Sequence, residues 1–81
     1  MDRKEKAQRA EDLLNDDVLQ SAFNVVSEYH TGVFLRVLAT EAEVLEARRM
    51  VLALNEVKNQ LRRYVATGQM IKKRDQDREH D

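Results

Sequence analysis

Apolar side chains recur with a helical period in the second half of the chain. Their spacings of three and four residues alternate, which is the heptad pattern of a helix that packs along one seam. The positions are Ala47, Met50, Leu54, Val57, Leu61, Tyr64 and Gly68. Upstream, Thr40 and Glu43 have capping-box spacing, in which the threonine caps the helix and the glutamate reaches back to the Thr40 amide. The pattern predicts a helix from Thr40 to about Thr67, ended by a left-handed Gly68.

An earlier apolar stripe predicts a second long helix. The stripe is broader than a two-stranded coiled-coil seam, so we expect this helix to touch more than one neighbour. Its members are Leu19, Ala22, Val26, Tyr29, Val33 and Val37, widened by Val18, Phe23, Val25, Phe34 and Leu38. Asn15 or Asp16 is placed to cap its start. The apolar phase is kept across Gly32, which favours a helix that continues to Leu38.

The two ends of the chain lack this periodicity. Residues 1–8 are polar, residues 9–14 suit a short amphipathic helix, and residues 69–81 are charged without an apolar stripe. The sequence therefore predicts an all-α fold, namely an antiparallel helical hairpin of two long helices with a short N-terminal helix against it. We expect this hairpin domain to span residues 9–68, with a flexible N-terminus (1–8) and a flexible charged tail (69–81).

Composition limits how so short a chain is stabilised. In 81 residues there is room for one domain at most, and burial must offset the entropy of ordering the chain. There is no cysteine for a disulfide, and only His30 and His80 could serve as nitrogen ligands for structural zinc. Charged residues make up 36% of the chain and proline is absent, which suits helices. Association with another macromolecule remains as a source of stability.

The apolar segments are short. No stretch reaches the roughly 18 to 20 apolar residues that a membrane span needs, and the longest run, residues 32–39, contains Arg36. The charged residues 1–6 lead into no signal-peptide segment. We expect a protein of the cytoplasm of the producing cell, without a membrane partner.

Charge is sorted along the chain although the net charge is only −1. Residues 11–56 hold nine acids against three arginines, a net of −6, whereas residues 58–74 hold six bases and no acid. Those bases are Lys58, Arg62, Arg63, Lys72, Lys73 and Arg74. In one interpretation they complement the helix dipole and, in a hairpin, lie beside Asp12, Asp16 and Asp17. In the alternative they contact nucleic acid or an acidic partner. The slightly negative net charge, and Tyr64 as the lone nearby aromatic, weigh against nucleic acid.

No catalytic constellation is expected. Ser21 and Ser27 fall in the middle of a predicted helix, and His30 lies beside the apolar stripe as a packed histidine would. Gly32 and Gly68 are too far apart for a phosphate-binding loop. We therefore expect a non-enzymatic protein with no cofactor, no metal and no small-molecule substrate.

The segment Arg9–Phe23 resembles the opening of small helical proteins encoded by tailed bacteriophages among virion-assembly genes. Its sequence is Arg-Ala-Glu-Asp-Leu-Leu-Asn-Asp-Asp-Val-Leu-Gln-Ser-Ala-Phe. Those proteins close with an alanine-leucine helix ending in glycine, as in Ala53 to Gly68 here. The chain departs from the pattern at Asp17, where many members have proline, and it has no tryptophan near Tyr29. The resemblance covers roughly residues 9–69. It implies a minor structural or assembly role and a place in the virion, and it carries over no catalytic motif.

Together these patterns favour an α-helical interaction protein that docks on a larger protein complex or forms a homo-oligomer. The expected interface residues are the apolar positions beside the main seam: Phe23, Val25, Phe34, Leu38, Met50 and Val51. Two alternatives stay open. One is nucleic-acid binding through the six bases above. The other is inhibition of a host protein by an acidic surface that includes Asp12, Asp16, Asp17 and Glu28.

Overall fold

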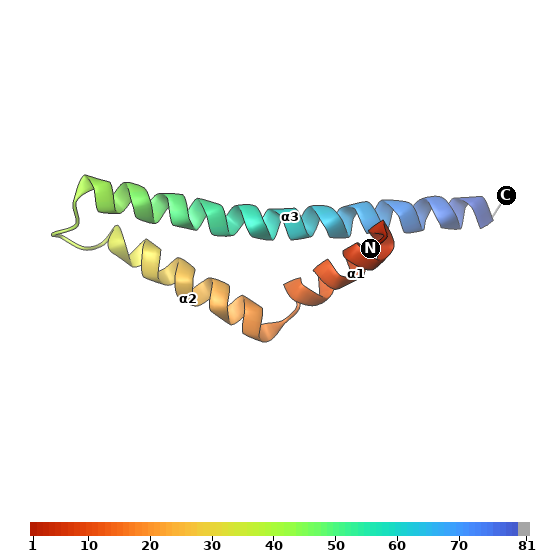
Figure 1. Cartoon of the computed structure of the whole chain (residues 1–81), viewed down its shortest axis with the longest axis horizontal. Coiled ribbons are helices and arrows are strands. Elements are labelled where there is room, and N and C mark those ends of the chain that lie inside the picture. The colour runs from red at the N-terminus through yellow and green to blue at the C-terminus, as the bar shows by residue number, and fades with distance from the viewer. Residues whose placement is uncertain (80–81) are drawn as a thin grey trace. The chain divides into compact units, whose positions relative to one another are not determined.

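The described part of the chain, residues 1–79 of a computed structural model, consists of helices and connections without a strand (Figure 1). The helices are α1 (Arg3–Leu14), α2 (Asp17–Val33) and α3 (Glu41–Glu79). The all-α prediction is confirmed. His80 and Asp81, part of the predicted tail, lie outside the described residues.

The chain divides into two compact units. The terminal unit contains residues 1–16 and 58–81, and the central unit contains residues 17–57. Helix α3 belongs to both, because its first half lies in the central unit and its second half in the terminal unit. Residues of the predicted domain, 9–68, occur in both units.

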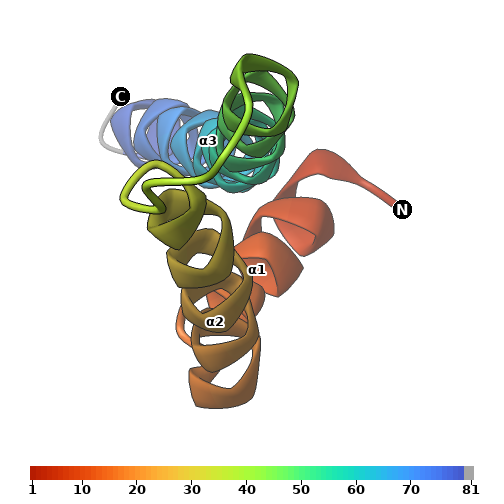
Figure 2. The same cartoon turned by 90° about the vertical axis from the view of Figure 1, so that its left-hand side faces the viewer.

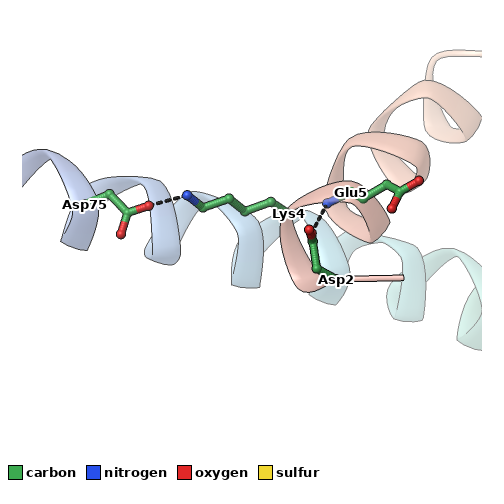
Figure 3. A network of polar contacts seen from close by, with 4 residues as sticks. All are labelled: Asp2, Lys4, Glu5 and Asp75. Atoms are coloured by element: carbon green, nitrogen blue, oxygen red, sulfur yellow. Dashed lines mark hydrogen bonds and ion pairs between the residues drawn. The ribbon is translucent and has the colours of Figure 1, made fainter.

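The N-terminal segment is helical from Arg3, within the residues (1–8) for which the sequence predicts a flexible segment. The Asp2 carboxylate accepts a hydrogen bond from the Glu5 amide at 2.8 Å and caps α1 (Figure 3). Arg9 pairs with the Glu5 carboxylate at 2.8 Å, one helical turn away. A cap and a charge pair on an otherwise polar segment supply the local stabilisation that apolar periodicity does not reveal.

Helix α3 passes through Gly68 and ends at Glu79, so two predictions about its C-terminus are wrong. Gly68 is not a left-handed cap, since no described glycine has a positive φ. It is buried instead, and a Cβ built on it would overlap the Ala7 Cβ and lie 3.7 Å from the Ala7 Cα. The glycine therefore permits close approach of α1. Residues 69–79, expected to be a flexible tail, are helical, and Asp75 forms an ion pair with Lys4 of α1 (Figure 3).

Helix α2 ends at Val33, so the prediction that it continues to Leu38 is also wrong. The amides of Phe34 and Leu35 donate to the carbonyls of Thr31 and Gly32 at 3.1 Å. These bonds reach three residues back rather than four, which tightens and closes the last turn. Because the next helix is capped at residue 40, residues 34–39 must serve as the connection although their apolar phase continues (Figure 2).

The predicted cap at the start of α3 is confirmed with one change. The Glu43 amide donates to the Thr40 hydroxyl oxygen at 3.2 Å, as an N-cap requires. The Glu43 carboxylate accepts from the Thr40 hydroxyl, also at 3.2 Å, in place of the Thr40 amide that a complete capping box would use.

Both units have small cores. The buried apolar residues of the described chain are Ala7 and Ala10 in the terminal unit, and Val33 and Ala47 in the central unit. Along the predicted seam, Leu54 and Leu61 are only half-buried. Much apolar surface is therefore left to solvent.

Candidate functional site

Helix α2 carries two adjacent apolar faces, and only one of them is covered. Leu19, Phe23 and His30 are half-buried on the covered face. The second face is exposed from Val18 to Tyr29, with 79% of Val18, 62% of Val25 and 61% of Tyr29 accessible to solvent. With the exposed Ala22 between them, Val18, Val25 and Tyr29 form what we call the open α2 face. Residues spaced three and four apart share one side of a helix, so this face is continuous.

The connection after α2 is the most exposed apolar segment of the central unit. Val37 is 97% and Leu38 93% exposed, and Leu35 is nearly as accessible. Arg36 lies between them, and its guanidinium carbon stands 5.6 Å from the centre of the Tyr29 ring. We call residues 34–38 the apolar connection. Aliphatic side chains that are this exposed contribute no burial free energy to folding. Their surface is therefore available for a partner.

The six predicted interface residues divide by exposure. Val25, Phe34, Leu38 and Met50 are exposed, whereas Phe23 and Val51 are half-buried. The sequence assigned Tyr29 and Val37 to the packed stripe, yet both are exposed. The early end of α2 explains why Val37 is exposed. Beyond Val33 the chain is no longer helical, so helical spacing does not determine which way a side chain faces. No signal in the sequence distinguishes the covered side of the broad α2 stripe from the open one.

The central unit also contains a shallow hollow of about 360 Å³ between α2 and the start of α3. Its lining residues are Tyr29, His30, Val33, Arg36, Ala42, Glu43, Glu46 and Ala47. The Tyr29 and His30 rings meet edge to face at 5.2 Å between centroids. The hollow combines an apolar floor with both signs of charge, which suits a protein side chain better than an ion.

The terminal unit gathers the bases. Helix α1 brings Arg3, Lys4, Lys6 and Arg9 to the part of α3 that contains all six predicted contact bases: Lys58, Arg62, Arg63, Lys72, Lys73 and Arg74. Counted from the sequence, this unit has eleven bases and nine acids, a net of +2, and the central unit has three bases and six acids, a net of −3. The acids predicted to face the bases are split, with Asp12 and Asp16 in the terminal unit and Asp17 in the central one.

Several of these bases have partners within their own unit. The Lys6 ammonium lies 5.0 Å from the centre of the Tyr64 ring. Arg62 donates to the Asn59 side chain at 3.0 Å, and Arg63 donates to Gln60 at 2.6 Å. These contacts hold the two arginine side chains along the helix surface.

A hollow of about 380 Å³ in the terminal unit places cations around apolar side chains. Its lining residues are Arg3, Thr67, Met70, Ile71, Lys73, Arg74 and Asp77. Beside it, the hydrogen bond from Lys4 lowers the pKa of Asp75, against the smaller opposing effect of desolvation, and the charges of Lys4, Arg78 and Arg74 lower it further. The Asp75 carboxylate is thereby held in its charged form, the form that pairs with α1.

Within residues 1–79 no cluster of three or more histidines, cysteines or carboxylates is arranged to hold a metal ion. No helix of that part of the chain is both long and apolar enough to cross a membrane.

No protein-family model matches the sequence, and no curated protein and no solved structure is significantly similar to it.

Proposed function

We propose that this chain is a non-enzymatic interaction protein that docks, through apolar side chains of its central unit, on a larger protein complex or on further copies of itself. One observation carries the proposal: large apolar side chains on α2, on the apolar connection and on α3 are exposed, while the central core contains Val33 and Ala47. A hairpin in which α2 runs antiparallel to the first half of α3, leaving the open α2 face outward, is part of the proposal.

The magnitude of the effect supports a partner. Burying one exposed valine or leucine side chain stabilises a complex by roughly 1.5 to 3 kcal/mol before association costs are subtracted. Leu35, Val37 and Leu38 alone offer several kcal/mol of such stabilisation. Their neighbour Arg36 and the acids of α3 supply the polar surroundings typical of the rim of a protein interface.

The resemblance to phage proteins of virion assembly makes a minor structural or assembly role part of this proposal. Such a component would be found in purified particles, or in assembly intermediates, at a fixed ratio to a major structural protein. Mass spectrometry of purified virions from the producing host tests this role. Recovery only with a host enzyme would instead favour the inhibitor alternative.

Docking is tested with a paired substitution in the apolar connection, Val37→Asp with Leu38→Asp. We expect the wild-type protein to form an oligomer or to recover one dominant protein partner, and the paired variant to lose that complex while keeping its helical circular dichroism. The control is Met70→Asp, which places one such charge on an exposed apolar position, 67% accessible, in the terminal unit. A monodisperse wild-type monomer that recovers no partner would refute the proposal.

Nucleic-acid binding is a second candidate, favoured by the bases that α1 adds to the terminal unit. Phosphate contacts release counterions, so such binding weakens steeply with salt. We expect the double substitution Arg62→Ala with Arg63→Ala to abolish it. Arg48→Ala with Arg49→Ala, an adjacent arginine pair in the central unit, is the control. Fluorescence anisotropy with labelled DNA and RNA measures this binding. Absence of binding at low salt would eliminate nucleic-acid binding as a function.

A further inference from the structure

The open α2 face is a short heptad strip. Val18, Ala22, Val25 and Tyr29 follow one another at spacings of four, three and four residues, the pattern by which one helix packs along another. All four are exposed. Resting on the proposed interaction function, we propose that the occupant of this face is the same face of a second copy of the chain, with the two α2 helices antiparallel.

The strip is complementary to itself in that orientation. When two copies pair antiparallel about the middle of the strip, Val18 of each lies opposite Tyr29 of the other, and Ala22 lies opposite Val25. Each contact then joins a smaller side chain to a larger one, which fills the space between helices evenly. A two-fold pairing of this kind is closed, so it yields a dimer rather than a filament.

Charge favours the antiparallel over the parallel arrangement. Helix α2 begins with Asp17, and at its other end the guanidinium of Arg36 lies over the Tyr29 ring, which in this pairing is opposite Val18 of the second copy. Antiparallel helices place the acidic start of each beside the more basic end of the other, and their dipoles oppose. Parallel helices would set Asp17 beside Asp17 and align the dipoles. The single acid near the middle, Glu28, falls toward Ser21 of the second copy and meets no second carboxylate.

The available area matches a stable dimer only when the apolar connection is included. Val26, 39% exposed at the edge of the open α2 face, adds to Val18, Val25 and Tyr29, and the connection adds Phe34, Leu35, Val37 and Leu38. Eight such side chains at on the order of 100 Å² each reach about 800 Å² per copy, the usual contribution of one partner to a specific interface. In this register residue 30 of one copy lies opposite Asp17 of the other, so the connection of each copy lies just beyond the start of α2 in the other and adds to the two ends of the interface.

The chemistry of the central unit argues against two other occupants. Its net charge of −3 opposes a phosphate backbone or an anionic lipid surface. A second copy also has a net charge of −3, but the strip itself holds no charged side chain, and the ends pair opposite signs. The repulsion between copies is thus spread over solvent-exposed residues, where salt screens it.

The first experiment compares Val25→Asp with Leu52→Asp by sedimentation equilibrium of the full chain at about 1 to 300 µM, the range that brackets a micromolar dissociation constant. Leu52 is exposed to a similar extent, 54%, on a face of α3 outside the proposed interface. We expect a wild-type dimer whose dissociation constant rises by roughly 100-fold or more in Val25→Asp, because the dimer would bury two unpaired carboxylates. Leu52→Asp should leave it unchanged.

Orientation is tested by cysteine pairing, which this chain permits because it has no cysteine of its own. Equal amounts of Val18→Cys and Tyr29→Cys are mixed and oxidised. The antiparallel arrangement predicts that the disulfide-linked product joins residue 18 of one copy to residue 29 of the other. Homodimers linked 18 to 18 and 29 to 29 would overturn the proposed orientation.

The remaining outcomes separate this proposal from the general one. A dimer that survives Val25→Asp, or that Leu52→Asp disrupts equally, overturns the α2 pairing. A folded wild-type monomer that tolerates Val25→Asp also overturns it, yet leaves docking on a different protein standing. A monomer that Val25→Asp unfolds shows the face to be covered within one chain, which overturns the α2 pairing and leaves docking through the apolar connection to the test with Val37→Asp and Leu38→Asp. Circular dichroism of each variant distinguishes the last two cases.

Discussion

Replacing Gly68 with alanine tests the contact by which α1 docks on α3. The added Cβ would overlap the Ala7 Cβ, and the backbone of α1 is close behind, with the Ala7 Cα at 3.7 Å. Neither neighbour is the flexible end of a long side chain, so the new methyl group fits only if α1 moves away. Gly32 provides the matched control, because a Cβ built there meets nothing within 4 Å and that glycine too is in a helix.

Both substitutions increase helix propensity, but only Gly68→Ala introduces a steric overlap. Alanine is preferred to glycine within a helix by about 0.8 to 1 kcal/mol, slightly less near an end, and both variants gain this. At Gly68, overpacking costs about 1 to 3 kcal/mol, and displacement of α1 re-exposes the Ala7 and Ala10 methyl groups at roughly 0.8 kcal/mol each. The expected result is stabilisation by about 0.5 to 1 kcal/mol for Gly32→Ala and net destabilisation by about 2 to 4 kcal/mol for Gly68→Ala.

Thermal unfolding and amide hydrogen exchange measure these effects together. A change of 1 kcal/mol shifts the midpoint of a domain of this size by roughly 4 to 8 °C, so the two variants should move in opposite directions. Exchange should show lost protection in α1 for Gly68→Ala, with α3 retained. Adding Ala7→Gly to Gly68→Ala removes the overlapping methyl group and should restore part of the protection. If Gly68→Ala alone stabilises the protein as Gly32→Ala does, the inferred close contact of α1 and α3 is wrong.

Two further predictions concern the caps and the ion pair. Thr40→Ala should destabilise the central unit by about 1 kcal/mol in chemical denaturation, because the Glu43 amide loses its hydrogen-bond acceptor. The control Thr67→Ala, within α3, should not have this effect. Equal effects of the two substitutions would contradict the capping role of Thr40. The carboxylate of Asp75 should titrate by NMR at a lower midpoint in the wild type than in Lys4→Met, since the Lys4 hydrogen bond lowers its pKa. The lowered pKa means that the pair stabilises the folded state at neutral pH and that this contribution is lost as the pH falls through the pKa of folded Asp75. An unchanged midpoint in Lys4→Met would contradict the pairing.

The helical character of the chain was predictable because it depends on local patterns. Apolar period and the absence of proline indicate helices, and Thr40 with Glu43 marks the start of α3 correctly. The ends of the helices were not predictable in the same way. Gly68 after a helical seam is typical of a C-cap, but the same residue also permits close helix packing, and only the position of Ala7 decides between these roles. The helical end of α3 is paired with residues some 70 positions earlier, beyond the reach of a local pattern.

The candidate interface was predictable in composition and only partly in position. The breadth of the α2 stripe indicates more apolar surface than one neighbour covers, and Val25, Phe34, Leu38 and Met50 are exposed in agreement with that. Which side of the stripe is covered depends on how α2 meets α3, which a period does not specify. The gathering of bases in the terminal unit likewise depends on α1 lying against the second half of α3.

The sizes of the buried residues connect stability with association. Three of the four buried apolar residues of the described chain are alanines, and Val33 is the largest. Ordering a residue costs about 1.5 kcal/mol, and burying an alanine methyl group returns roughly 0.8 kcal/mol, so such cores are weak for their length. The largest reserve of apolar surface lies on α2 and the apolar connection, outside either core. Covering that reserve would therefore stabilise the chain more than any rearrangement of its small buried residues, and on the proposed function folding and association are expected to be coupled.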